Sequence, residues 1–267
     1  MSCSRAGRAS AKCYSATADA SRPLDFTART EVSDPDGEIL ALAEVLEEPF
    51  HEIQFRLDLS NEKEWRSAER TTWSVYPTYA HGLGNGSIKF EVSLREAPIL
   101  EPALLPQLPQ AYFTHLEFEP AVLPCLHECE LIAEKLRAAY QRRKARDVYD
   151  LAVFANRPRQ EHLIRKALIL KLWNVRDSFD PAAFDARLAE KDRYDWDDLF
   201  ELLPKRDREP PESLLGRVRR GFSFLAGLTE TEAELAADAA QRRWAAAEAL
   251  RKECRAIVRG ATPASTR

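Results

Sequence analysis

The sequence predicts an α+β fold in which a mixed α/β part is followed by a helical part. Residues 24 to about 124 combine β-branched and aromatic residues with prolines and short turns, as strands and their connections do. From about residue 126 to the end, apolar residues recur at the spacing of amphipathic helices. This order favours an α+β protein with two lobes. We therefore expect an α/β core over residues 1–124 and a helical lobe over residues 125–267.

One short helix and two strands are expected in the first part. The run ILALAEVLEE (39–48) predicts the helix. HEIQFRLDLS (51–60) and SIKFEVSLRE (87–96) alternate as half-buried strands do. HGLGNG (81–86) predicts a turn before the second strand, because glycine accepts a positive φ.

Helical periodicity dominates the second part, and its expected helices cover 126–142, 146–156, 159–172, 181–189, 195–203, 211–225 and 229–258. Thr229 is the expected N-cap of the last helix, with Glu232 as its capping-box partner. Pro210 and Pro211 predict a break before the helix at 211–225. The aromatic residues Trp173, Trp196 and Phe200 fall at apolar helical positions and are expected in the core.

Composition excludes several classes of protein. A charged fraction of 31% and a mean hydropathy of -0.43 indicate a soluble chain, and no apolar run approaches the roughly 20 residues of a membrane span. The first residues are basic and polar without an apolar segment, which predicts no secretory signal. The net charge of -4 argues against a protein that coats nucleic acid non-specifically, although a local basic patch remains compatible with it.

The cysteines favour a reducing cytoplasm over a disulfide framework, because they are odd in number and scattered, at Cys3, Cys13, Cys125, Cys129 and Cys254. The stretch CLHEC (125–129) has no second pair of ligands downstream, and a structural zinc ion needs four. Ordinary residues at the start of a helix are therefore favoured there.

The stretch AEKLRAAYQRRKARDVYDLAVF (133–154) places charges where packing alone favours leucine or alanine. Lys135 lies beside an apolar stripe, and its ammonium could simply extend to solvent. Asp147 lies at the start of a helix, where a carboxylate interacts favourably with the helix dipole. Alternatively, Lys135, the basic turn QRRK (141–144) and the carboxylates of Asp147 and Asp150 converge to bind a polyphosphate. The residues alone leave both interpretations open.

The longer stretch ELIAEKLRAAYQRRKARDVYDLAVF (130–154) resembles the signature of the AbiEii/AbiGii nucleotidyltransferase-like toxins, which include the mycobacterial MenT enzymes. The family pattern contains an aEKlrAl segment followed by RDlyDl. GNGSIKFEVSLRE (84–96) resembles the family's strand that carries the third acid of the site. RYDWDDLFELLP (193–204) resembles its later helical segment with tryptophan. The resemblance covers most of the chain from about residue 24.

This resemblance implies a polymerase-β-like nucleotidyltransferase core followed by a helical lobe that carries the EKLRA and RDVYDL motifs. Such enzymes move a nucleotide from an NTP to an RNA acceptor, the 3′ end of tRNA in the MenT branch, with Mg²⁺ or another divalent cation. By position, Lys135 contacts the triphosphate and Asp147 is the essential acid, with Arg146 beside it at the nucleotide. Asp25 is a catalytic acid and, with Glu91, a metal ligand; Gly7 belongs to the phosphate-binding turn.

The chain departs from the family pattern near its N-terminus. The family has a GG[ST] turn and then an S.DLDF run with two metal-binding aspartates, whereas this chain reads RAGRASAKCYSATADASRPLDFT (5–27). Gly7 remains, Arg8 replaces the Ser or Thr, and Pro23 stands in place of the first aspartate. The pattern indicates a truncated or degenerate N-terminus, and we hypothesise that parts of residues 5–23 reflect a frame-shifted or wrongly assigned gene start.

Two functions follow from this comparison. The first is a cytoplasmic nucleotidyltransferase toxin of a toxin–antitoxin system, with an NTP, an RNA acceptor and a cognate antitoxin as partners and no membrane contact. The alternative is a catalytically impaired homologue that only binds nucleotide, RNA or antitoxin. Losing one of the three carboxylates is the feature that separates them, because such a loss lowers the rate of metal-assisted transfer by orders of magnitude.

Overall fold

The structure is a computed structural model that describes residues 9–11, 24–30, 32–50, 53–60, 67, 71–82, 84–107, 111–115 and 119–260. The chain divides into two compact units, Met1–Leu126 and His127–Arg267. The predicted boundary at 124/125 lies two residues before this division. The first unit is called the α/β unit and the second the helical unit.

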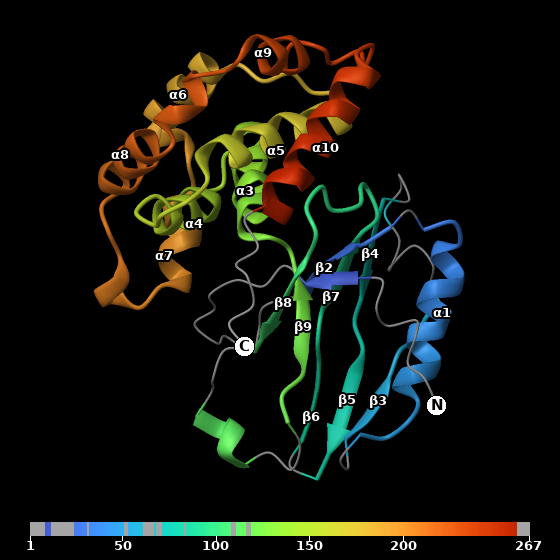
Figure 1. Cartoon of the computed structure of the whole chain (residues 1–267). Helices are drawn as coiled ribbons and strands as arrows, with labels where there is room; N and C mark the ends of the chain where they lie inside the picture. Colours follow the sequence, from blue (N-terminus) through green and yellow to red (C-terminus); the bar gives the residue numbers. More distant parts are fainter. Residues whose placement is uncertain are drawn as a thin grey trace, which may run out of the picture. The chain divides into compact units, whose positions relative to one another are not determined.

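Among its described residues, the α/β unit contains two sheets and one α-helix (Figure 1). Its strands are β1 (Ala9–Ala11), β2 (Leu24–Ala28), β3 (Gln54–Arg56), β4 (Thr72–Val75), β5 (Thr78–His81), β6 (Gly84–Ser87), β7 (Phe90–Ser93), β8 (Ala103–Pro106) and β9 (Val122–Cys125). Its helices are α1 (Pro35–Leu46) and the 3-10 helix η2 (Ala111–His115).

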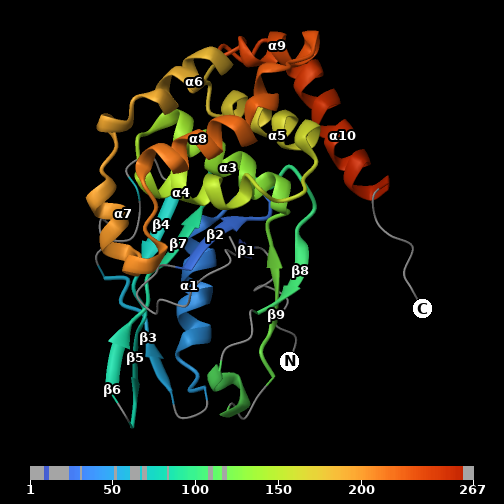
Figure 2. The same ribbon diagram turned by 90° about the vertical axis from the view of Figure 1, so that its left-hand side faces the viewer.

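The larger sheet has the strand order β4-β7-β2-β1-β9-β8, and the smaller one the order β3-β5-β6. Strands β2 and β7 run parallel, although a long stretch of chain separates them. The helix α1 packs on one face of the larger sheet, where Ile39 shares a buried cluster with Trp73, Val75 and Val92 (Figures 1 and 2). This cluster fixes the central strands that carry the candidate acids.

Local chemistry explains where α1 begins. The carboxylate of Asp34 accepts a hydrogen bond from the backbone N–H of Gly37 at 3.0 Å, and proline occupies the first turn. The helix therefore starts four residues before the predicted 39–48. The expected strand at 51–60 shortens to β3, and the expected strand at 87–96 shortens to β7.

The prediction of a turn at 81–86 was wrong in part, because Gly84–Ser87 form strand β6, which pairs with β5. The composition points to a turn because three of these six residues are glycine. Backbone pairing with β5 overrides that preference, and the chain reverses between His81 and Gly84. Gly84 has a φ of 154°, which a residue with a side chain rarely adopts.

The helical unit contains eight α-helices among the residues that the structure describes. They are α3 (Glu128–Gln141), α4 (Ala145–Phe154), α5 (Glu161–Asn174), α6 (Pro181–Ala189), α7 (Trp196–Leu202), α8 (Pro211–Gly221), α9 (Glu230–Ala236) and α10 (Trp244–Gly260). Short 3-10 helices lie between them at η3 (Lys191–Arg193), η4 (Lys205–Asp207) and η5 (Ser223–Ala226).

The core of this unit surrounds α5, which is buried along most of its length from Leu163 to Trp173. Helices α3, α9 and α10 pack against it (Figure 1). Trp173 is 1% exposed, which confirms its predicted place in the core, whereas Trp196 and Phe200 are half-buried.

The predicted single helix at 229–258 was wrong, because α9 ends at Ala236 and α10 begins at Trp244. Gln241 causes the break: its backbone has a φ of 55°, and its side-chain amide donates to the carbonyl of Trp173 at 2.7 Å. This hydrogen bond provides a donor for a backbone carbonyl in the last turn of α5. The predicted capping box is confirmed, because the Thr229 and Glu232 side chains each bond the other's backbone N–H.

The cysteines differ in part from the expectation of free thiols, because Cys125 is disulfide-bonded. Cys129 and Cys254 are buried free thiols. The expectation of helix-start residues at 125–129 is confirmed for His127, which is the N-cap of α3 and accepts from the backbone N–H of Cys129 at 3.2 Å. Across the described residues, every helix is too short or too polar to cross a bilayer.

Candidate functional site

Two of the predicted acids, Asp25 and Glu91, are direct neighbours in the larger sheet of the α/β unit. Asp25 lies on β2 and Glu91 on β7, and the two residues are register partners in the parallel pair. Directly paired residues project to the same face of a sheet, at a spacing of about 5 Å. The fold thus brings together two carboxylates that are 66 residues apart in the chain.

A cation already lies at this carboxylate pair. The ammonium of Lys89 is 2.8 Å from Oε2 of Glu91, and the hydrogen bond to Glu91 raises the pKa of Lys89, with the charge of Asp25 adding to it. The location therefore attracts positive charge.

The donor chemistry at this pair fits a divalent cation such as Mg²⁺, which binds through one or two carboxylates and keeps several waters. Among the described residues, no cluster of three or more potential metal-ligating side chains occurs.

In the helical unit, Lys135 extends from α3 towards two carboxylates on α4. Its Nζ atom is 2.6 Å from Oδ2 of Asp150 and 3.8 Å from Oδ1 of Asp147. The Lys135 side chain is only 16% exposed. The interpretation that its ammonium simply extends to solvent was therefore wrong. The convergence of Lys135 with Asp147 and Asp150 is confirmed, and the binding of a polyphosphate there stays a prediction.

Asp147 is the buried centre of this group. Its side chain is 2% exposed, and the guanidinium of Arg142 binds both carboxylate oxygens, from Nε at 2.8 Å and from Nη2 at 3.1 Å. Such a bidentate pair fixes the orientation of the two side chains as well as pairing their charges. The side chain of Arg142 is itself 60% exposed. Lys135, Arg142, Asp147 and Asp150 together form what we call the α3–α4 charge cluster.

Local structure explains how α4 presents Asp147. Arg142 is the C-cap of α3, and the chain turns over only two residues before α4 begins at Ala145. Asp147 lies in the first turn of α4, where its backbone N–H donates to the carbonyl of Lys144 at 3.0 Å. A carboxylate in this position interacts favourably with the helix dipole. The dipole interpretation of Asp147 therefore holds alongside its ion pairs.

Arg146, the predicted neighbour of Asp147 at the nucleotide, points elsewhere. Its Nε atom is 3.1 Å from Oδ2 of Asp198 on α7. The arginine on Asp147 is instead Arg142, which the sequence offers only as one of several basic residues in the turn at 141–144. Helical geometry could have identified Arg142, because the C-cap residue of α3 lies directly before the turn that leads back to Asp147.

Gly7, together with the departures Arg8 and Pro23, lies outside the described residues. The structure therefore brings together Lys135 with Asp147 in one unit and Asp25 with Glu91 in the other. Sequence reasoning named Arg142 only as part of the basic turn at 141–144, and it missed Lys89, the lysine at the sheet acids.

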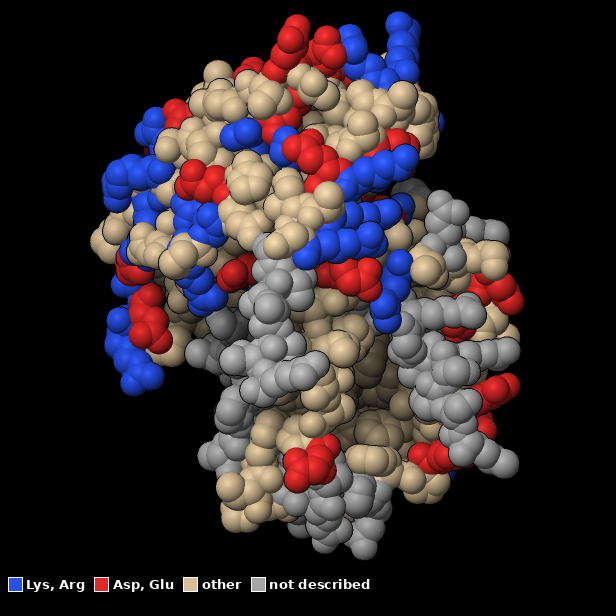
Figure 3. Space-filling view, in the orientation of Figure 1, with Lys and Arg blue, Asp and Glu red and all other residues tan. Residues whose placement is uncertain are grey.

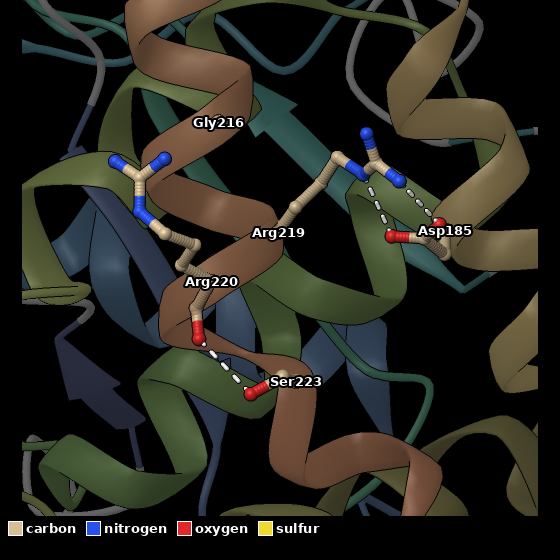
Figure 4. A pocket seen from close by; sticks show the side chains of 5 residues that line it. All are labelled: Asp185, Gly216, Arg219, Arg220 and Ser223. Carbon is tan, nitrogen blue, oxygen red and sulfur yellow. Dashed lines mark hydrogen bonds and ion pairs between the residues drawn. The ribbon is translucent and has the colours of Figure 1, made fainter.

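A separate surface cavity of about 430 Å³ lies between α6 and α8 in the helical unit, lined by Asp185, Gly216, Arg219, Arg220 and Ser223 (Figure 4). Arg219 binds both carboxylate oxygens of Asp185 at 2.7 Å, and this pairing lowers the pKa of Asp185. Arg220 points away from this pair (Figure 4). None of the predicted site residues lines the cavity, so it is not the site that the motifs predict.

Solved structures were found that are similar to this chain. The structure described as MenT4, nucleotidyltransferase toxin Rv2826c from Mycobacterium tuberculosis H37Rv, superposes with a TM-score of 0.71 at 23% identity, over 93% of this chain and 85% of that chain. A putative nucleotidyltransferase from Helicobacter pylori matches at 15% identity with a TM-score of 0.46, over 85% of this chain and 91% of that chain. The first likeness confirms the predicted α+β fold.

Sequence comparison identifies the family. No curated protein sequence matches the chain. The family described as nucleotidyl transferase AbiEii toxin, type IV TA system, matches residues 11–252, which is most of the chain. That span contains both the sheet acids Asp25 and Glu91 and the α3–α4 charge cluster. The chain therefore belongs to the AbiEii family of nucleotidyltransferase toxins of type IV toxin–antitoxin systems.

Proposed function

We propose that this chain transfers a nucleotide from an NTP to an RNA acceptor in the cytoplasm, with the 3′ end of tRNA as the acceptor. The observation that carries the proposal is the α3–α4 charge cluster, in which the largely buried ammonium of Lys135 and the guanidinium of Arg142 share one buried carboxylate. Nucleotidyl transfer needs cations that hold phosphate oxygens in a fixed geometry.

In this mechanism, Lys135 binds the triphosphate and Asp147 holds Lys135 and Arg142 in place. Lys135 exchanges its contact with Asp150 for phosphate oxygens, an exchange favoured because a triphosphate carries more charge than one carboxylate. The acceptor hydroxyl then attacks the α-phosphorus in line, so that a new P–O bond forms as the bond to pyrophosphate breaks.

Asp25 and Glu91 are the residues that would hold the divalent cation. When bound, such a cation neutralises charge on the phosphates and lowers the pKa of an attacking hydroxyl. Lys89, whose ammonium is 2.8 Å from Oε2 of Glu91, would give up this contact to a cation held by the two carboxylates.

The distribution of charge supports an RNA acceptor. The helical unit has 28 Lys and Arg against 24 Asp and Glu, a net charge of +4, whereas the α/β unit has 11 against 19, a net charge of -8. Lys252, Arg255 and Arg259 are exposed on α10 at the i, i+3 and i+7 spacing of one helix face. Figure 3 shows Lys and Arg side chains gathered along this helix. Phosphate contacts of this kind position a nucleic acid without reading its sequence.

Family membership implies an antitoxin partner and a nucleotide substrate. The competing function, a homologue that binds without turnover, rests on Pro23 and Arg8 in the family's N-terminal motifs. Both functions predict nucleotide or RNA binding, and only the first predicts incorporation of label.

The test incubates the purified chain with tRNA, Mg²⁺ and each labelled NTP in turn. We expect incorporation with at least one NTP, and its loss by roughly a hundredfold or more in Lys135→Ala and in Asp147→Ala. Lys205→Ala is the control, because Lys205 is an exposed lysine of the same helical unit that lies outside the basic turn and the α3–α4 charge cluster. No incorporation with any NTP would contradict the enzyme, and the Pro23→Asp variant with a restored Gly-Gly-Ser turn at 6–8 then asks whether the N-terminal motif is the cause.

A further inference from the structure

A second charge network lies beneath the α3–α4 charge cluster, between α3 and α5. The ammonium of Lys171 on α5 is 2.8 Å from Oε1 of Glu130 and 2.8 Å from Oε1 of Glu134. Arg137 binds the other oxygen of Glu134 at 2.6 Å. The side chains of Lys171 and Glu130 are 2% and 0% exposed, so this network is part of the core.

Stability alone does not explain this network. Removing two charges from water costs several kcal/mol per ion, and well-packed apolar residues of similar volume often stabilise a core as well or better. The adjacent positions of α5 are apolar, and Leu170 and Leu172 are as buried as Lys171, so the core around this charge is packed mainly by apolar side chains. A buried ion network does fix the orientation of the helices that carry it, because each charge reaches its partner at only one rotation and one register of the helix.

The geometry of α3 connects this network to Lys135. Glu130, Glu134 and Arg137 share one helix face, and Lys135 follows Glu134 with a rotation of about 100°. Consecutive residues therefore contact two different helices: Glu134 binds Lys171 on α5, and Lys135 binds Asp150 on α4. Figures 1 and 2 both show α3 between α4 and α5. A rotation of α3 that releases Glu134 also moves Lys135 away from its carboxylates.

We propose that Lys171 is a positioning residue, whose contacts with Glu130 and Glu134 fix the rotation of α3 and so aim the ammonium of Lys135 at the nucleotide. It acts through α3 and not by touching substrate. The expected effect on nucleotide binding rests on the proposed function. The expected effect on the position of Lys135 does not depend on it.

Lys166 provides a matched control on the same helix. Its ammonium is also nearly buried and binds two glutamates, Glu232 at 3.4 Å and Glu253 at 3.2 Å. These partners lie on α9 and α10, away from the α3 face. Variants of Lys171 and Lys166 therefore remove equivalent ion pairs from α5, but only those of Lys171 release α3.

The experiment compares two charge-balanced double variants in the full chain. Lys171→Met with Glu130→Gln leaves Glu134 paired with Arg137, and Lys166→Met with Glu253→Gln leaves Glu232 paired with Arg165. For each, a crystal structure gives the distance from Lys135 Nζ to Asp150 Oδ2, and calorimetry gives the dissociation constant for each NTP with Mg²⁺.

We expect the Lys171 variant to move Lys135 Nζ beyond roughly 4 Å from Asp150 and to weaken NTP binding by about 10- to 100-fold. The Lys166 variant keeps the wild-type distance of 2.6 Å and the wild-type affinity. Lys135 at its wild-type position in the Lys171 variant would overturn the inference.

Two outcomes separate this inference from the proposed function. A wild-type chain that binds no NTP contradicts the proposed function, while the crystallographic distance still decides the role of Lys171. If the Lys171 double variant does not fold, Glu134→Gln replaces it, because Glu134 is 13% exposed and the Lys171–Glu130 pair stays intact. An unmoved Lys135 in Glu134→Gln would contradict the role of the Lys171–Glu134 contact in aiming Lys135.

Discussion

At the scale of single residues, the two carboxylates that meet Lys135 have different surroundings. Asp147 is 2% exposed and binds the bidentate Arg142, while Asp150 is 31% exposed and contacts Lys135 at 2.6 Å. The buried carboxylate therefore holds two cations in place, and the exposed one provides a contact that a triphosphate can replace. The sequence predicts both acids on one face of α4, but it does not reveal which is buried.

This difference predicts unequal costs of substitution. Asp147→Asn leaves Arg142 and Lys135 without their shared counter-charge and lowers the free energy of unfolding by about 3 kcal/mol. Asp150→Asn removes one half-exposed pair and lowers it by less than about 1 kcal/mol. Urea unfolding followed by circular dichroism measures both. Equal costs would contradict the assignment of Asp147 as the residue that holds the cluster together.

The free thiols give a second prediction at this scale. Burial raises the pKa of Cys129 to about 11 and that of Cys254 to about 12, so the reactive thiolate is scarce near neutral pH. We expect iodoacetamide at about pH 8 to leave both unmodified in the folded chain and to modify both in guanidinium. Peptide mass mapping assigns each site. Modification of Cys254 at the same rate in both conditions would show that its burial on α10 is wrong.

At the scale of elements, the sequence predicts what local chemistry determines. The positions of α5, α6 and α8 follow from periodicity and proline, and the Thr229–Glu232 capping box follows from its spacing. The break at Gln241 could not be predicted, because it depends on a contact with the carbonyl of Trp173, 68 residues earlier. The pairing of Asp25 with Glu91 is equally non-local, and only the family resemblance placed both residues in one site.

Glu232 connects α9 to α5 and predicts how stability depends on pH. Burial alone would raise its pKa, but the backbone N–H of Thr229 and the guanidinium of Arg165 outweigh burial and lower it below the ordinary 4.5. Because the folded pKa is lower than the unfolded one, the stabilisation is complete above pH 4.5 and is lost as pH falls through the folded value.

Glu232→Gln should therefore lower the free energy of unfolding by about 2 kcal/mol near pH 7, and the difference from wild type should shrink as the pH falls below 4.5. Guanidinium unfolding at a series of pH values measures this difference. Glu230→Gln, an exposed position in the first turn of the same helix, is the control. A difference that stays constant down to acid pH would contradict the lowered pKa.

At the scale of the whole molecule, opposite charges separate between the two units. The net charge of -4 conceals +4 on the helical unit and -8 on the α/β unit. A polyanion such as the proposed RNA acceptor responds to the local field, so the overall net charge is a poor guide to where it would bind. On α10, Trp244 adds a large aromatic surface that is 58% exposed, although its ring also packs edge-on against Trp173 at 4.9 Å.

This charge separation predicts that RNA affinity depends on where a charge is reversed. Lys252→Glu with Arg259→Glu removes two exposed cations from one face of α10 and should reduce the slope of log affinity against log salt by about 2. Arg56→Glu with Arg95→Glu makes the same change in net charge on exposed residues of the α/β unit and should leave the slope unchanged. Fluorescence anisotropy with labelled tRNA over a range of salt concentrations measures both slopes. Equal reductions in the two variants would mean that net charge, and not the α10 face, controls RNA binding.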